Sequence, residues 1–234
     1  MNVKAIKIQD YTYELPDERI AKYPLDERDA SKLLIFKEKN IAENTYRHIG
    51  NYIADGSLML FNNTKVIPAR LNFQRATGAN IEIFCLEPVG ELTSGMLGKG
   101  ESLWVCMVGN AKKWKDNETL TLNIGDITLT AQIEMRSREG LHVRFKWQPA
   151  DLSFAEILQS FGQVPLPPYL NRDADAEDRE RYQTIYARFD GSVAAPTAGL
   201  HFTDRVFEDF KAKNIENQYV TLHVGSGTFK PVKA

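Results

Sequence analysis

The stretch ITLTAQIEMRSREGLHVRFKW, residues Ile127–Trp147, decides the fold of the middle of this chain. Apolar and polar residues alternate along Ile127–Met135 and again along Leu141–Trp147, and the turn residues SREG separate the two runs. Such alternation is typical of strands that bury one face. The stretch therefore predicts two antiparallel strands joined by a turn.

Three earlier segments are also rich in residues that favour β-strands. They are Ile81–Leu86, Leu103–Val108 and Thr119–Ile124. Short strands broken by turns at this spacing are typical of a small antiparallel barrel. We expect residues 72–149 to form a β-barrel domain.

The helical period returns on the C-terminal side of this region. The expected helices are Leu152–Phe161, Ala176–Arg188 and Thr203–Lys213. On the N-terminal side, Lys32–Lys37 and Leu58–Phe61 have the pattern of strands. We therefore predict an α/β main domain that is discontinuous, formed by residues 1–71 and 150–234, into which the small antiparallel β-barrel domain is inserted. The prolines of VPLPPYL predict a stiff extended connector at Val164–Leu170.

Composition narrows the functional classes. The chain has 234 residues and a net charge of −2, so any nucleic-acid surface has to be a local patch. No apolar run has the length of a membrane span and the N-terminus lacks a secretory signal, so we expect a cytoplasmic protein without a membrane partner. Cys85 and Cys106 are expected to be buried thiols, and no Cys/His cluster indicates a metal site.

The segment GSVAAPTAGLHFT (Gly191–Thr203) contains the most unusual residue choices. Its small residues allow close approach of the backbone, and Thr203 followed by Asp204 is a good helix start whose free amides could face a carboxylate or phosphate. The alternative is that Thr203 only caps the helix and that His201 is an ordinary hydrogen-bonded histidine.

A second segment, YVTLHVGSGTFKPV (Tyr219–Val232), places His223 just before Gly225. Glycines at the C-terminal end of a strand let a ligand meet bare backbone. A tight turn is the other interpretation of the same residues.

A third segment, Glu177–Arg188, places Arg179, Tyr182 and Tyr186 on one face of the expected helix. Mixed cations and aromatics suit stacking on bases and contact with phosphates. A solvated helix with internal ion pairs is the commoner meaning of this mixture.

Five segments in order resemble the signatures of the S-adenosylmethionine:tRNA ribosyltransferase-isomerase family. They are LFNNTKVIPARL (Leu60–Leu71), VPLPPYL (Val164–Leu170), DRERYQTIYAR (Asp178–Arg188), VAAPTAGLHF (Val193–Phe202) and VTLHVGSGTFKPV (Val220–Val232). The opening YELPDERIAKYPLDERDASKLL is similar to the same family. Because that family continues beyond the last of these segments, we expect the chain to be an incomplete part of a longer enzyme.

The resemblance implies a transferase that moves and isomerises the ribosyl group of S-adenosylmethionine. The acceptor would be 7-aminomethyl-7-deazaguanine at the wobble position of tRNA, and the products epoxyqueuosine, adenine and methionine. S-adenosylmethionine would be a consumed co-substrate, so no cofactor is expected. The partners would be tRNA and S-adenosylmethionine, and the sequence leaves the oligomeric state open, a monomer included.

The resemblance also assigns residues. His201 and His223 are the candidates for proton transfer, because a histidine changes charge near neutrality, although either could instead orient the substrate. The other candidates are substrate-binding residues: Arg70, Tyr182, Arg188, Gly199, Thr203, Gly225, Gly227 and Thr228. Thr203 and the glycines would act through backbone amides, and Arg70, Tyr182 and Arg188 would contact tRNA or substrate.

Two other functions compete with this one. A non-catalytic RNA-binding module would bind tRNA but not S-adenosylmethionine. An S-adenosylmethionine-dependent methyltransferase would need a strand, a glycine loop and a helix in succession, whereas the only candidate loop, GMLGKGE (Gly95–Glu101), lies between two expected strands.

Overall fold

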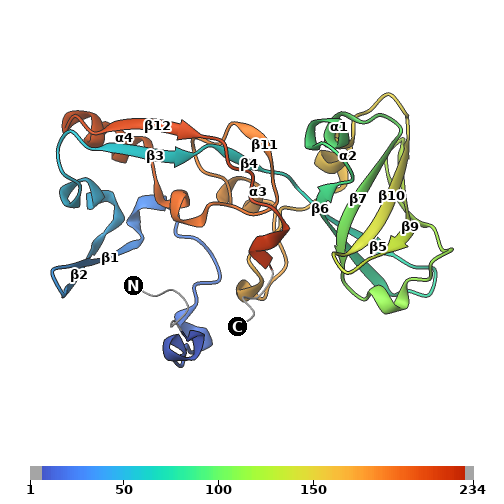
Figure 1. The fold of residues 1–234 in the computed structure, drawn as a ribbon, viewed down its shortest axis with the longest axis horizontal. Helices are drawn as coiled ribbons and strands as arrows, with labels where there is room; N and C mark the ends of the chain where they lie inside the picture. Colours follow the sequence, from blue (N-terminus) through green and yellow to red (C-terminus); the bar gives the residue numbers. More distant parts are fainter. Residues whose placement is uncertain (1–6, 230–234) are drawn as a thin grey trace.

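The computed structural model describes residues 7–229, which form a barrel and a more open part (Figure 1). The barrel, on the right of the view, holds strands β5 to β10. The remaining strands and helix α4 lie on the left.

Six antiparallel strands form one sheet in the order β5-β6-β7-β10-β9-β8. Their bounds are β5 (Arg70–Gln74), β6 (Asn80–Pro88), β7 (Glu101–Val108), β8 (Leu120–Ile124), β9 (Ile127–Arg136) and β10 (Leu141–Gln148). The edge strands β5 and β8 lie against each other, so the sheet curls into a nearly closed barrel (Figure 1). The predicted antiparallel barrel is therefore present, and the β9–β10 hairpin falls within Ile127–Trp147 and the residues beside it.

Alternation along the strands explains this barrel. Leu71 and Phe73 of β5 are buried in the core, whereas the residues between and beside them face outward. Ile81 and Ile83 of β6 are buried in the same way. Along these stretches one face of the strand supplies the core and the other is left polar, whereas further along β6 both faces are buried, at Phe84, Cys85 and Leu86.

Helix α2 (Phe154–Phe161) packs on the barrel core, as does the short helix α1 (Leu92–Leu97). A capping box between Ser153 and Glu156 starts α2, where a helix was expected. The ring of Phe154 lies 5.2 Å from that of Trp104 and 5.2 Å from that of Phe145. Complete burial of such a side chain stabilises the fold by about 1.5–3 kcal/mol.

Cys85 and Cys106 are free, buried thiols, as expected. They stand opposite each other on β6 and β7. Burial raises the pKa of the Cys106 thiol, and the neighbouring Cys85 raises it further.

Parallel pairs of strands join distant parts of the chain. Strand β3 (Leu58–Asn62) pairs with β12 (Glu216–Val220), and β4 (Thr64–Val66) pairs with β11 (Phe189–Ser192). Helix α4 (Asp204–Ala212) packs on the first pair, near the 3₁₀ helix η5 (Tyr46–Tyr52). The cluster between them contains Phe61, Phe202, Val206, Phe210 and Ile215. A separate antiparallel hairpin is formed by β1 (Lys32–Lys37) and β2 (Asn40–Thr45).

The helix expected over Ala176–Arg188 is much shorter. Only α3 (Asp178–Arg181) forms, so Arg179, Tyr182 and Tyr186 do not share one helical face, and that prediction was wrong. The guanidinium of Arg28 binds the carbonyl oxygens of Glu180, Arg181 and Gln183, which draws the backbone out of the helical path.

None of the helices in the described residues is both long enough and apolar enough to cross a membrane.

Candidate functional site

The connector Val164–Leu170 forms a wall shared by three hollows of the structure. It is extended as far as Pro167 and ends in the short 3₁₀ helix η7 (Pro168–Leu170). We call them the histidine groove, which contains His201, the threonine hollow, which contains Thr228, and the polar cleft, which contains Arg70. Residues of the connector line each of them. Because proline restricts rotation about its backbone φ angle, the prolines of this connector keep the shared wall rigid.

The histidine groove has a volume of about 290 Å³. Its lining consists of Ile20, Ala21, Tyr23, Pro24, Leu25, Arg28, Ser31, Tyr169, Leu170, Arg181, Tyr182, Thr197, Leu200 and His201. Two predicted site residues, His201 and Tyr182, are therefore brought together, although they come from different segments.

His201 ends the 3₁₀ helix η8 (Thr197–His201) and is half-buried. Its Nδ1 lies 3.4 Å from the carbonyl oxygen of Arg28, and its ring centroid lies 5.0 Å from that of Tyr46. Because a carbonyl can only accept, this contact favours the tautomer that carries the proton on Nδ1 and the lone pair on Nε2, for which no partner is found among the described residues. A neutral imidazole in this state can accept a proton through Nε2.

Arg28 holds the groove together. Its Nη1 donates to the carbonyl of Gln183 at 2.9 Å and to that of Leu200 at 3.1 Å, which ties the turn after α3 to η8. Burial lowers the pKa of Arg28, with a smaller effect of Arg181, but arginine remains charged at neutral pH. Arg28 was not predicted as a site residue, although it lies in the opening segment that resembles the family.

Tyr182 is buried, and burial raises the pKa of its phenol. It therefore enters the groove as a neutral group that can donate or accept a hydrogen bond. The nearby ion pair of Arg172 and Asp178, with contacts of 2.6 and 2.7 Å, fixes the segment that precedes α3.

The threonine hollow lies on the other side of Tyr169 and Thr197, which also line the histidine groove. Its remaining lining residues are Pro165, Pro167, Ala194, Ala195 and Thr228. Thr228, a predicted site residue, is thus adjacent to the groove that holds His201 and Tyr182.

Thr203 caps α4 by accepting from the amide of Val206, and its hydroxyl donates to the buried carboxylate of Asp29. The carboxylate found at the start of α4 is therefore that of Asp29, a residue of the chain itself. Gly199 is buried, and a Cβ there would come within 2.3 Å of the Tyr186 hydroxyl. Its lack of a side chain serves close packing.

Among the described residues that line the three hollows, His223 does not occur. It is exposed, and its Nδ1 is 2.8 Å from the hydroxyl of Thr64. Arg188 is exposed and stacks over Phe189. The structure therefore does not bring His223 or Arg188 together with His201.

Gly225 and Gly227 occupy open space. A Cβ at either position would meet no other atom of the described chain within 4 Å. Their expected role as ligand contacts stays a prediction.

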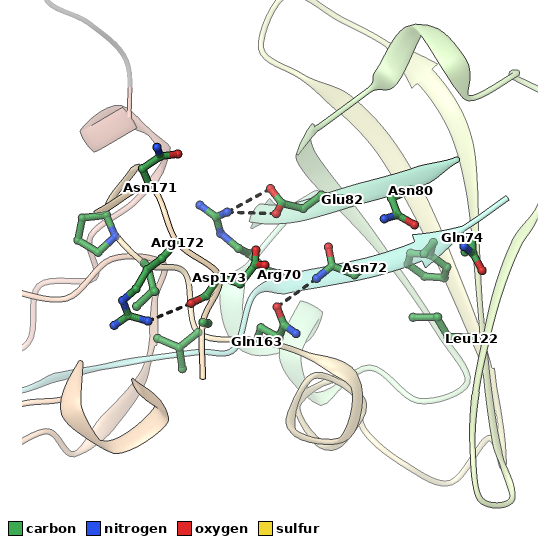
Figure 2. Close-up of a pocket in the computed structure, with 15 residues that line it drawn as sticks. Arg70, Asn72, Gln74, Asn80, Glu82, Leu122, Gln163, Asn171, Arg172 and Asp173 are labelled. Carbon is green, nitrogen blue, oxygen red and sulfur yellow. Dashed lines mark hydrogen bonds and ion pairs between the residues drawn. The ribbon is translucent and has the colours of Figure 1, made fainter. Parts of the chain in front are cut away.

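The polar cleft, at about 870 Å³, is the largest of these three hollows, and it contains Arg70 (Figure 2). It lies between the outer face of β5 and β6 and the segment 163–174. Its lining consists of Arg70, Asn72, Phe73, Gln74, Asn80, Glu82, Leu122, Gln163, Val164, Leu166, Pro167, Asn171, Arg172, Asp173 and Ala174. Of these, only Arg70 was predicted as a site residue, because alternation predicts a polar face but not the wall opposite it.

Within residues 7–229, no group of three or more His, Cys, Asp or Glu side chains is arranged to hold a metal ion.

Comparison with known proteins gives a consistent result. A family model described as "Queuosine biosynthesis protein" matches residues 8–234. An S-adenosylmethionine:tRNA ribosyltransferase-isomerase of Trichlorobacter lovleyi is 40% identical over 229 residues, covering 97% of this chain and 62% of that protein. One of Sulfurihydrogenibium sp. is 38% identical over 231 residues, covering 97% of this chain and 64% of that protein.

The chain thus spans less than two thirds of the length of these relatives. Among solved structures, an S-adenosylmethionine tRNA ribosyltransferase from Thermotoga maritima is 30% identical, with a TM-score of 0.33. That match covers 91% of this chain and 57% of the other.

Proposed function

Because the chain belongs to the queuosine biosynthesis protein family, we propose that it is part of an S-adenosylmethionine:tRNA ribosyltransferase-isomerase. The reaction would transfer and isomerise the ribosyl group of S-adenosylmethionine onto 7-aminomethyl-7-deazaguanine at the wobble position of tRNA. Adenine and methionine would leave, and epoxyqueuosine would remain in the tRNA. Such an enzyme would meet its tRNA in the cytoplasm.

The observation that carries this proposal is the histidine groove. The sulfonium of S-adenosylmethionine acidifies the adjacent C5′ protons, so the reaction needs a positioned base. His201 offers a free Nε2 lone pair, because its Nδ1 faces the carbonyl of Arg28. Tyr182 supplies a neutral hydroxyl on another wall of the same groove.

The other site residues keep their proposed roles. His223 is a second candidate for proton transfer, and its contact with Thr64 orients its ring. Arg188 and Arg70 would contact tRNA or substrate. The backbone-binding role falls to Thr203, Gly199, Gly225 and Gly227, with Thr228 beside them as a substrate contact.

We also propose the division into domains that the sequence predicted. Residues 1–71 and 150–234 would form one discontinuous α/β domain, and residues 72–149 the inserted barrel. The parallel pairing of β3 with β12 supports the first part, since it joins residues 58–62 to residues 216–220. Limited proteolysis tests this division: cuts near residues 72 and 149 should release the barrel, and protection of both boundaries would contradict it.

One assay tests the function. The full-length protein, at the length of its relatives, is incubated with S-adenosylmethionine and tRNA that carries the aminomethyl precursor, and free adenine is measured by chromatography. Adenine release should require the precursor-bearing tRNA, and tRNA with ordinary guanine at the wobble position is the control. We expect the 234-residue form to bind S-adenosylmethionine weakly or not at all and to release no adenine.

Two outcomes would contradict the proposal. If the full-length protein binds tRNA but neither binds S-adenosylmethionine nor releases adenine, it is a non-catalytic RNA-binding module. If methylated tRNA forms instead of free adenine, it is a methyltransferase.

A further inference from the structure

We propose that the polar cleft binds an unpaired nucleotide of the RNA substrate and reads its base through side-chain amides. This inference rests on the proposed function, because it takes RNA as the partner. It assigns a ligand class to a hollow in which the sequence singled out one residue.

Amide side chains stand on both walls of the cleft. On the barrel side, Asn72 and Gln74 of β5 and Asn80 of β6 lie on the outer face of the sheet, while Gln163 and Asn171 stand on the other wall (Figure 2). An amide side chain both donates and accepts hydrogen bonds. The edge of a nucleobase presents the same mixture of donors and acceptors, and unpaired RNA bases are commonly recognised in this way.

Two of these amides are free to bind a ligand. Asn72 donates to the side chain of Gln163 at 3.1 Å, which links the two walls. By contrast, the side chains of Asn80 and Asn171 make no hydrogen bond with any residue of the described chain. They lie on opposite walls of the cleft (Figure 2). Each of them could therefore bind a ligand in the cleft without breaking an existing hydrogen bond.

The two arginines that line the cleft are both paired with carboxylates. Nη1 of Arg70 lies 3.2 Å from each carboxylate oxygen of Glu82, and Arg172 is paired with Asp178. Asp173 adds a further carboxylate to the lining. With both cations compensated, the cleft does not favour backbone phosphates, which are bound by uncompensated lysine and arginine. Neutral base edges suit it better.

Arg70 adds a planar cation to the cleft. Its guanidinium lies 5.1 Å from the centroid of the Phe84 ring, and its Nε is buried without a hydrogen-bond partner in the described chain. Because buried donors are nearly always paired, a ligand that draws this guanidinium towards the cleft would satisfy the unpaired Nε. A guanidinium can also stack on a base through its free face.

The size of the cleft fits this ligand. Pockets for small ligands measure about 300–1,000 Å³, and the cleft measures about 870 Å³. It also shares Pro167 with the threonine hollow, so a bound nucleotide would lie next to the connector that lines the proposed active site.

The test uses the full-length protein with the double substitution Asn80→Ala/Asn171→Gly. Glycine is chosen at position 171 because Asn171 has a φ of 48°, a left-handed conformation that glycine adopts without strain. Because neither side chain is hydrogen-bonded, the fold should be unchanged. The matched control is Gln132→Ala, an exposed amide on β9 outside the cleft. We measure the affinity for precursor-bearing tRNA over a range of salt concentrations, and the affinity for S-adenosylmethionine.

The expected result is a loss of tRNA affinity of about 10-fold in the double variant, the order that loss of a base contact gives. The slope of affinity against salt should stay that of the wild type, because no phosphate contact is removed. The affinity for S-adenosylmethionine and that of Gln132→Ala for tRNA should not change.

Three results would overturn the inference: tRNA affinity equal to that of the control, a reduced salt slope, or a loss of S-adenosylmethionine affinity in place of tRNA affinity. The failure of the proposed function is distinguishable. If the wild-type protein binds tRNA without releasing adenine, the proposed reaction is refuted. A lower tRNA affinity of the double variant would even then support binding of a nucleotide in the cleft.

Discussion

The hydroxyl of Thr203 donates a 2.8 Å hydrogen bond to the carboxylate of Asp29, 174 residues earlier in the chain. Asp29 is fully buried and also accepts from Arg205 at 3.1 and 3.2 Å. The start of α4 is therefore attached to the N-terminal segment that lines the histidine groove. This contact links the stability of the helix to the shape of the groove.

Asp29→Ala should therefore destabilise the protein by about 1–3 kcal/mol, because it removes the acceptor of the Thr203 and Arg205 hydrogen bonds. Urea unfolding followed by circular dichroism measures the change. Glu208→Ala, an exposed acidic position on α4, is the control and should change stability by less than about 0.5 kcal/mol. Equal stability of the two variants would show that the contact adds little.

Gly199→Ala should be destabilising for a steric reason. The new Cβ would lie 2.3 Å from the hydroxyl oxygen of Tyr186 and 2.9 Å from Cγ2 of Thr184. Overpacking of this kind costs about 1–3 kcal/mol. Gly225→Ala is the matched control, because a Cβ there meets no described atom within 4 Å.

A double variant identifies the clash. Adding Tyr186→Phe to Gly199→Ala removes the oxygen and should restore at least about 0.5 kcal/mol beyond the sum of the single effects. Strict additivity would mean that Tyr186 is not the obstacle.

The barrel shows what a sequence of this kind predicts well. The strand predicted at Ile81–Leu86 lies within β6, and the cap at Thr203 starts α4 as predicted, because both signals are local. The parallel register of β3 with β12 carries no comparable signal, since it depends on packing between segments far apart in the chain.

The site was predictable only in part for the same reason. His201 and Tyr182 belong to segments that the family resemblance marks, and the structure places them in one groove. Arg28 was missed because its role arises from distant carbonyls, among them those of Gln183 and Leu200. The early end of α3 was missed too. Helical periodicity in the sequence carries no information on the guanidinium of Arg28, which binds the carbonyl oxygens at the end of this helix.

Stability should fall at alkaline pH because of Tyr186. Burial, with a smaller effect of Tyr219, raises the pKa of Tyr186 to about 12, whereas an unfolded tyrosine ionises near about 10. The folded state thus keeps a proton that the unfolded state loses. Stability should be unaffected below about pH 10 and should decrease as the pH rises to about 12. Burial also raises the pKa of Tyr46, which adds to the effect.

Melting temperatures at several pH values between 8 and 12 measure this loss. Tyr186→Phe should reduce the alkaline decrease, whereas Tyr11→Phe, at an exposed tyrosine, should leave it unchanged. If Tyr186→Phe leaves the alkaline decrease in melting temperature unchanged, the decrease is caused by other ionisable groups.

His201→Ala in the full-length protein tests the proposed base. Loss of a proton-transfer group lowers turnover by about 10²–10⁴-fold. The fold should remain intact, because the side chain contributes one long hydrogen bond of 3.4 Å and a ring contact with Tyr46. His48→Ala, at an exposed histidine of η5, should retain wild-type turnover. His201→Asn separates proton transfer from orientation, because its amide nitrogen takes the place of Nδ1 and can still donate to the carbonyl of Arg28 but cannot act as a base. If His201→Asn has near wild-type turnover, His201 orients the substrate and the base is another group. If both variants lose turnover while their melting temperatures match the wild type, the free Nε2 of His201 is required for the chemistry.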